Sequence, residues 1–113
     1  MSCLFCKIVA GEIPAAKVYE DDQLIAFNDI NPQAPTHVLI LPKQHVATLK
    51  DLSPADDALI GAMVRRAAAI AKEKGFDGPG YRTVFNCNAQ ARQTVFHVHL
   101  HVLGGRTFAW PPG

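Results

Sequence analysis

Three of the five histidines in the 113-residue chain stand at alternate positions of one short run, HVHLHVL, residues 97–103. Successive side chains of a β-strand point to opposite faces of the sheet. The run therefore predicts a strand on which His97, His99 and His101 share one face. The apolar residues between and beside them would lie on the other face, against the core: Phe96, Val98, Leu100 and Val102.

Three kinds of site fit such a row of imidazoles. The first is a solvated polar face, although each neutral histidine needs a partner that fixes its tautomer. The second is one metal ion held by all three rings. The strand rise opposes it, because the Cα atoms of His97 and His101 would lie roughly 13 Å apart. The third is phosphoryl chemistry, in which a neutral imidazole attacks phosphorus and a neighbouring imidazole neutralises phosphate oxygens or protonates the leaving group.

Local patterns predict the elements that position this row. Apolar and β-branched runs indicate strands at 17–19, 23–28, 36–41, 81–86 and 95–103. Ser53 as N-cap and Pro54 at the first helical position begin a helix predicted over 54–73, and Gly75 ends it. With a short N-terminal helix, this pattern is typical of an α+β domain with an antiparallel sheet. We expect residues 1–113 to form a single domain.

Composition excludes several classes of function. The formal net charge is +1 with neutral histidines, so the chain offers no broad basic surface for nucleic acid. It contains neither an apolar run of membrane-spanning length nor a signal-peptide layout, so we expect no membrane partner. Three cysteines are an odd number, which argues against a disulfide framework. We therefore expect a cytoplasmic location.

The run HVHLHVL resembles the alternating signature of the histidine triad family, and the likeness covers nearly the whole chain. Four segments are similar, in the same order, to the histidine-triad nucleotide-binding branch: SCLFCKIVAGEIP, AFNDINPQAPTHVLILPKQH, NCNAQARQTVFHVHLHVLGGR and WPPG. The resemblance implies a histidine-triad fold, with a five-stranded antiparallel sheet, one long and one short helix, and a sheet continued across a homodimer. It also implies hydrolysis of purine nucleoside 5′-phosphoramidates and aminoacyl adenylates through a nucleotidyl-histidine intermediate, without a catalytic cofactor.

The same resemblance assigns roles to individual residues. His99 takes the position of the nucleophile, His101 contacts the phosphate, and His97 and Thr94 complete the catalytic group. Asp29 holds the ribose hydroxyls, and His37 is a buried histidine behind the triad. The remaining nucleotide-binding positions line the phosphate, namely Asn86, Gln93 and Thr94, or the base, namely Leu4, Phe5, Ile8, Phe27, Asn28 and Ile30.

The chain departs from the family pattern beside the phosphate positions. Ala91 and Arg92 stand where many relatives have paired glycines, and Thr94 stands where relatives often have serine. A backbone N–H can reach the phosphate here only if Arg92 adopts the conformation that glycine allows. The side chain of Arg92 could instead extend toward the leaving group or solvent, so the preferred leaving amine stays open.

Cys3 and Cys6 form a CxxC pair, which alone suits redox chemistry, free thiols or half of a zinc site. A closed zinc site needs two more ligands. Related triad enzymes with this pair use a four-ligand arrangement, which implies a structural zinc held by Cys3, Cys6, His45 and His97.

The tail, residues 104–113, carries the only tryptophan of the chain, Trp110. A large aromatic side chain near a terminus should be held by something, because leaving it in water forfeits roughly 2 kcal/mol of burial. The resemblance implies that Trp110 borders the site of the partner subunit, while packing on its own subunit is the alternative. Two other functions stay open: a nucleotide-binding or interaction module with vestigial activity, and a dinucleoside polyphosphate hydrolase.

Overall fold

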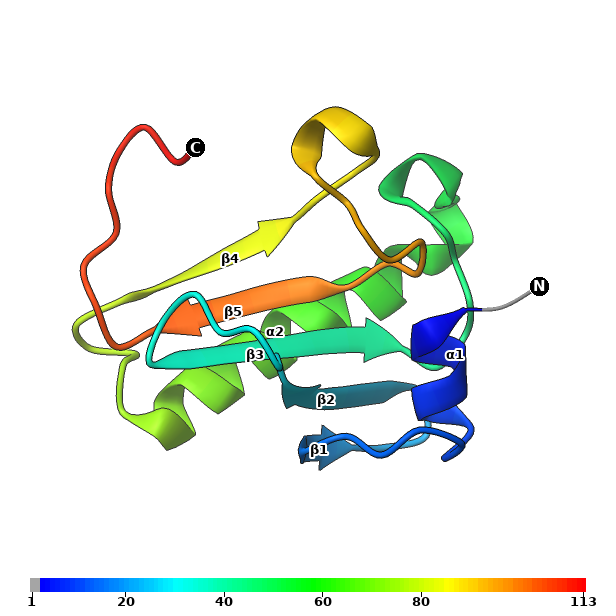
Figure 1. Ribbon diagram of the computed structural model, residues 1–113, viewed down its shortest axis with the longest axis horizontal. Helices are drawn as coiled ribbons and strands as arrows, with labels where there is room; N and C mark the ends of the chain where they lie inside the picture. The colour runs from blue at the N-terminus through cyan, green and yellow to red at the C-terminus, as the bar shows by residue number, and fades with distance from the viewer. Residues whose placement is uncertain (1–2) are drawn as a thin grey trace.

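The computed structural model describes residues 3–113, which form a five-stranded antiparallel sheet with the strand order β1-β2-β3-β5-β4 (Figure 1). The two α-helices lie on opposite faces of this sheet. The strands and helices have these bounds: β1 Lys17–Glu20, β2 Leu24–Asn28, β3 Thr36–Pro42, β4 Tyr81–Phe85, β5 Leu100–Gly104, α1 Leu4–Val9 and α2 Asp57–Lys74. The predicted α+β class, with one long and one short helix, is confirmed, while the continuation of the sheet across a homodimer stays a prediction.

Alternation along the central strands builds two apolar layers. Val38 and Ile40 of β3 point toward α2 and pack with Met63 and Ile70 of that helix. Their neighbours on β3 point the other way, toward α1, where a second cluster gathers. This second cluster consists of Phe5, Ile8, Ile25, Phe27, Leu39 and Leu41. The α1 side of the sheet is therefore the side on which β3 and β5 can present His37 and His101.

The signals predicted for the long helix are present in the structure. The side chain of Asp56 accepts a hydrogen bond from the backbone N–H of Ser53 at 2.9 Å, which closes a capping box. The first turn, Pro54–Asp56, is a 3₁₀ turn, and α2 itself spans Asp57–Lys74. Gly75 ends the helix with a φ of +89°. The prediction of a helix over 54–73 is therefore confirmed apart from its first turn.

The predicted strand over 95–103 is wrong in its first half, because β5 begins only at Leu100. The register that pairs Ile40 with Leu100 would place Val98 opposite Pro42, which has no N–H to donate to a ladder. The N–H of Val98 instead donates to the carbonyl of Val46 at 2.7 Å. Residues 95–99 thus form an irregular segment, and Phe96, predicted to face the core, is 47% exposed.

The tail leaves the end of β5, passes the start of β4 and continues away from the sheet (Figure 1). The guanidinium of Arg82 donates to the carbonyl of Ala109 at 3.0 Å, and Trp110 is 82% exposed. Within residues 3–113, no helix is both long and apolar enough to cross a bilayer.

Candidate functional site

A pocket of about 270 Å³ opens on the α1 side of the sheet. Its apolar wall comes from α1 and β2, and its polar wall comes from the loop after β2 and from the segment that leads into β5. It is lined by Leu4, Phe5, Ile8, Phe27, Asn28, Asp29, Ile30, Leu39, Thr94, Val95, His99 and His101. All six residues predicted to surround the base line this pocket. Leu39 and Val95 were not predicted to line a pocket, because in the sequence an apolar residue at a pocket looks like any core residue.

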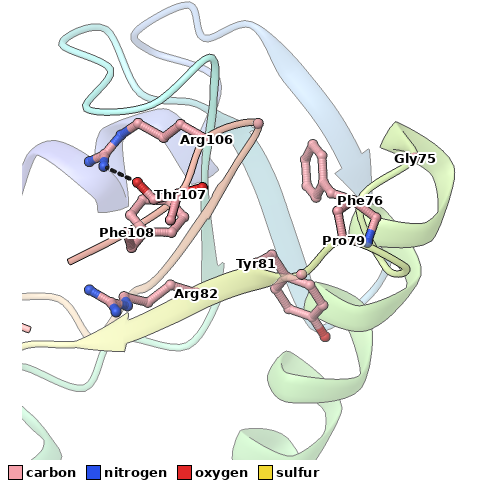
Figure 2. A pocket seen from close by; sticks show the side chains of 10 residues that line it. Gly75, Phe76, Pro79, Tyr81, Arg82, Arg106, Thr107 and Phe108 are labelled. Atoms are coloured by element: carbon pink, nitrogen blue, oxygen red, sulfur yellow. Dashed lines mark hydrogen bonds between the residues drawn. The ribbon is translucent and has the colours of Figure 1, made fainter. Parts of the chain in front are cut away.

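A larger cavity, about 600 Å³, lies between the α2–β4 connection and the tail (Figure 2). Two arginines line it, Arg82 and Arg106, but none of its described lining residues is a histidine, a cysteine or a carboxylate. Of these two cavities, the smaller one is therefore the one lined by histidines, His99 and His101.

His99 lines this pocket, and its Nε2 is unprotonated. Its Nδ1 lies 2.7 Å from the carbonyl oxygen of His97, and a carbonyl can only accept, so Nδ1 carries the proton. Burial lowers the pKa of His99, an effect that its bond to the His97 carbonyl opposes. In the neutral ring Nε2 therefore keeps its lone pair. The ring of Phe5 packs against the ring of His99 in an edge-to-face arrangement, with 5.0 Å between the two centroids.

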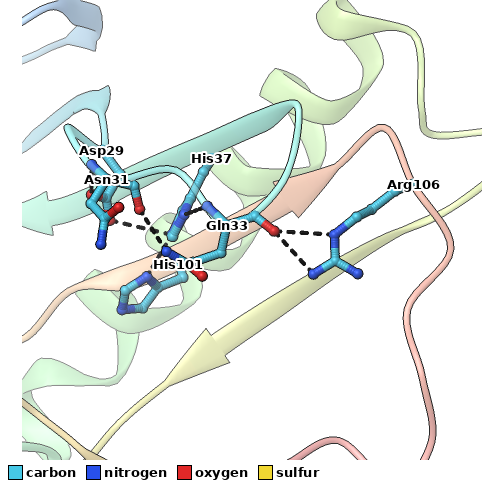
Figure 3. Close-up of polar contacts among 6 residues, drawn as sticks. All are labelled: Asp29, Asn31, Gln33, His37, His101 and Arg106. Carbon is cyan, nitrogen blue, oxygen red and sulfur yellow. Dashed lines mark hydrogen bonds and ion pairs between the residues drawn. The ribbon is translucent and has the colours of Figure 1, made fainter.

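His101 has the opposite tautomer, because a chain of hydrogen bonds fixes it (Figure 3). The N–H of Gln33 donates to Nδ1 of His37 at 3.0 Å, so the proton of the neutral His37 ring sits on Nε2. That nitrogen lies 2.8 Å from Nδ1 of His101 and 3.4 Å from a carboxylate oxygen of Asp29. With Nδ1 accepting from His37, neutral His101 carries its proton on Nε2.

Both members of this histidine pair are neutral near pH 7. Burial lowers the pKa of His37, and the carboxylate of Asp29 opposes that shift. Burial, followed by the proximity of His99 and His37, lowers the pKa of His101 to about 4. The rings of His99 and His101 are 5.0 Å apart between centroids. One ring can thus offer a lone pair and its neighbour an N–H to the same ligand.

The predicted phosphate residues occupy different places. Thr94 lines the pocket, whereas Asn86 and Gln93 lie outside its lining. The side chain of Gln93 is buried, and both its amide oxygen and its amide nitrogen have hydrogen-bond partners. The oxygen accepts from the N–H of Asn88 at 2.9 Å, and the nitrogen donates to the carbonyls of Ala47 and Val95 at 2.8 and 3.1 Å. Gln93 therefore holds the loop that presents Thr94.

Arg92 adopts the left-handed conformation that glycine favours, with φ +64° and ψ +39°. Its backbone N–H is already bonded to the carbonyl of Ala89 at 2.9 Å. Its side chain is exposed, so the guanidinium is the group that Arg92 can offer to a ligand.

The four predicted zinc ligands converge beside α1. Nδ1 of His97 lies 3.5 Å from Sγ of Cys3, 3.5 Å from Sγ of Cys6 and 3.3 Å from Nδ1 of His45. A tetrahedral zinc ion with ordinary bond lengths sets its ligands about 3.4 Å apart for two nitrogens and about 3.6 Å for sulfur and nitrogen. The donor set and its spacing therefore fit zinc.

The outer partner of His97 supports the same conclusion. Its Nε2 donates to the carbonyl of Pro42 at 2.7 Å, which leaves the lone pair of Nδ1 for a metal. A second group, Asp29, His37 and His101, also brings its donor atoms together, but the hydrogen bonds of the histidine chain already account for their positions.

Known proteins of one family resemble this chain in sequence and in structure. The family described as scavenger mRNA decapping enzyme, C-terminal binding, matches residues 2–108. The purine nucleoside phosphoramidase of Escherichia coli is 46% identical over 103 residues, which cover 91% of this chain and 87% of that protein. A crystal structure of a HIT family hydrolase from Legionella pneumophila superposes with a TM-score of 0.98 at 53% identity, over 99% of this chain and 100% of that one. A zinc-bound histidine triad family protein from Mycobacterium smegmatis has a TM-score of 0.81 at 39% identity, over 100% of this chain and 81% of that one.

Proposed function

Since this chain belongs to the histidine triad family, we propose that it is a hydrolase of purine nucleoside 5′-phosphoramidates and aminoacyl adenylates, which releases the nucleoside monophosphate. The observation that carries the proposal is the opposite protonation of two neighbouring rings, with the lone pair of His99 beside the N–H of His101. The Escherichia coli relative named purine nucleoside phosphoramidase supports the choice of substrate.

The proposed reaction uses two steps. The base occupies the apolar wall, Asp29 accepts hydrogen bonds from the ribose hydroxyls, and the phosphate lies beside Thr94 and the two rings. Neutral His99 attacks phosphorus through Nε2, the phosphorus–nitrogen bond breaks with its electron pair going to nitrogen, and the nitrogen takes up a proton from water and leaves as the amine. His101 donates its Nε2 proton in a hydrogen bond to a phosphate oxygen, where charge accumulates. Water then attacks the nucleotidyl-His99 intermediate, releases the monophosphate and restores neutral His99.

Rapid-quench kinetics with adenosine 5′-phosphoramidate test this function. We expect wild-type protein to form a nucleotidyl-enzyme and then adenosine monophosphate, and His99→Asn to form neither while it still binds the monophosphate. Diadenosine polyphosphate serves as the comparison substrate, and we expect a lower kcat/KM for it. Near-normal turnover by His99→Ala, or preferred cleavage of the polyphosphate, would contradict the proposal.

We propose a structural zinc ion at Cys3, Cys6, His45 and His97, which the zinc-bound Mycobacterium smegmatis relative supports. Zinc would tie α1 to the segment before β5 and supply folding free energy, with no part in the reaction. Elemental analysis of protein purified without chelators should find one zinc per chain, and Cys6→Ser should lose it. We expect chelation to lower stability more than activity, and a chain without zinc would refute the assignment.

We also propose a homodimer in which the tail borders the site of the partner. Strand β4 is an edge of the sheet, so its free N–H and C=O groups can pair with a second copy. The 82% exposure of Trp110 leaves its indole free for such a contact. Deletion of residues 107–113 should change the selectivity among leaving amines and leave monophosphate affinity nearly unchanged. A monomer at micromolar concentration in light scattering would refute the shared site.

A further inference from the structure

The base of the tail is fastened to the loop that carries Asp29. Nε and one terminal nitrogen of Arg106 both donate to the carbonyl oxygen of Gln33, at 3.1 and 3.0 Å (Figure 3). The guanidinium lies 4.2 Å over the centroid of the Phe108 ring, which holds its plane. Gly105 has a φ of +96°, and a Cβ there would meet the Cβ of Pro35 at 2.9 Å. The tail and this loop are therefore packed closely at this point.

Gln33, the residue that Arg106 holds, also fixes the histidine pair. Its N–H donates to Nδ1 of His37, which places the proton of the neutral ring on Nε2, where the carboxylate of Asp29 lies 3.4 Å away and favours the same tautomer. The other nitrogen of His37 in turn decides the tautomer of His101. If Gln33 moved away, His37 could take its other tautomer, and the proton of His101 could then sit on Nδ1. His101 would then present a lone pair to the pocket, which cannot donate to a phosphate oxygen.

The same loop positions the carboxylate of the pocket. The side chain of Gln33 donates to the carbonyl of Asn31 at 3.0 Å, and the N–H of Asn31 donates to Asp29 at 2.9 Å. Residues 29–33 are thus linked to one another, and Arg106 links Gln33 to the tail. A displacement of Gln33 would disturb both Asp29 and His37.

We propose that Arg106 is a positioning residue of the active site, which holds Gln33 so that His101 keeps its proton on Nε2. Arginine suits this role because its planar fork places two donors on one carbonyl and stacks on an aromatic ring, whereas lysine offers a single flexible ammonium. The catalytic part of this proposal rests on the proposed function, but its structural part, the tautomers of His37 and His101, does not.

The test compares Arg106→Gln and Arg106→Lys with a matched control, Arg82→Gln. Arg82 donates to the carbonyl of Ala109 and lies 5.1 Å over the same Phe108 ring, but within residues 3–113 its side chain makes no hydrogen bond to Gln33. Its replacement loosens the tail and leaves the loop intact. Imidazole ¹⁵N chemical shifts of the free protein report the tautomers of His37 and His101, and steady-state kinetics report kcat and KM.

We expect Arg106→Gln to mix the tautomers of both rings. It should also lower kcat roughly tenfold, which is the order of loss when a hydrogen-bond partner that positions a reacting group, without touching the substrate, is removed. Its thermal midpoint should stay near that of the wild type, and Arg106→Lys should recover part of kcat. Arg82→Gln should match the wild type in the tautomers of His37 and His101, so any change in kcat that it causes through the tail comes without mixed tautomers. Unchanged tautomers in Arg106→Gln, an unchanged kcat with mixed tautomers, or equally mixed tautomers in Arg82→Gln would each overturn the proposal. If the wild type cleaves no phosphoramidate, the proposed function fails, and the ¹⁵N shifts still decide the role of Arg106.

Discussion

Acid should destabilise this protein through His101. Burial, together with the proximity of His99 and His37, lowers the pKa of His101 from 6.5 to about 4 in the folded chain. The folded state therefore favours the neutral ring, while the unfolded chain takes up a proton below pH 6.5. The contribution of neutral His101 to stability is fully present above the unfolded pKa, and it is lost as the pH falls toward about 4.

The size of the loss follows from the two pKa values. Between pH 7.5 and pH 5, a group with a pKa of 6.5 unfolded and about 4 folded costs the folded state about 2 kcal/mol. His101 is partly exposed, and solvent screening reduces this figure to about 1 kcal/mol. The matched variant is His101→Gln, which does not titrate and whose amide oxygen can still accept from Nε2 of His37.

Urea unfolding of both proteins at pH 7.5, 6.5, 5.5 and 5.0 measures the effect. The difference in unfolding free energy between wild type and His101→Gln should shift by about 1 kcal/mol over this range, to the disadvantage of the wild type at low pH. Loss of zinc in acid affects both proteins alike and cancels in the difference. Parallel pH profiles for the two proteins would refute the reasoning, as would an NMR titration of His101 with a midpoint near 6.5.

Three further predictions concern the sugar and two glycines. Asp29→Asn should weaken binding of ribonucleotides by about 10-fold or more, because charge-assisted hydrogen bonds contribute about 1.5–3 kcal/mol, and should weaken 2′-deoxyribonucleotides less. Equal losses in calorimetry would remove Asp29 from the ribose site. Gly104→Ala should lower the unfolding free energy by about 3 kcal/mol, because its Cβ would lie 2.5 Å from ring atoms of buried Phe76. Gly61→Ala should raise it by about 1 kcal/mol, because Gly61 stands inside α2 with no neighbour within 4 Å of the added methyl group. Urea unfolding measures the change in unfolding free energy of both variants, which should be negative for Gly104→Ala and positive for Gly61→Ala. A Gly104→Ala variant as stable as the wild type would show that Phe76 can move aside.

Local patterns were enough to predict most of the fold. The capping box at Ser53 and the stop at Gly75 depend on neighbours a few residues away, and the structure contains both. The strand at 36–41 could be predicted for the same reason, and it extends by one residue to Pro42. Local patterns were not enough to predict the base pocket, because Phe5 and Ile8 have the spacing of an ordinary core helix. Only the resemblance to a known family separated a pocket wall from core packing.

Contacts between distant segments could not be predicted in the same way. The bond from Arg106 to Gln33 spans 73 residues, and an exposed arginine in a tail gives no sign of its partner. The role of Gln33 is harder still to predict, because its backbone N–H, and not its side chain, binds Nδ1 of His37. Residue types alone therefore located the reactive rings but not the groups that set their tautomers.

The failure of the alternating pattern before Leu100 has a chemical consequence at the site. Pro42, opposite Val98, has no N–H, so the strand pairing stops there, and its carbonyl accepts from Nε2 of His97. The ring of His97 is thereby turned toward the cysteines with Nδ1 free for zinc. The carbonyl of His97, outside any ladder, accepts from Nδ1 of His99 and leaves the lone pair of Nε2 of that ring free for the proposed attack. A strand that continued through residues 95–99 would engage this backbone in ladder bonds and remove that acceptor, so the irregular segment is a condition of the proposed chemistry.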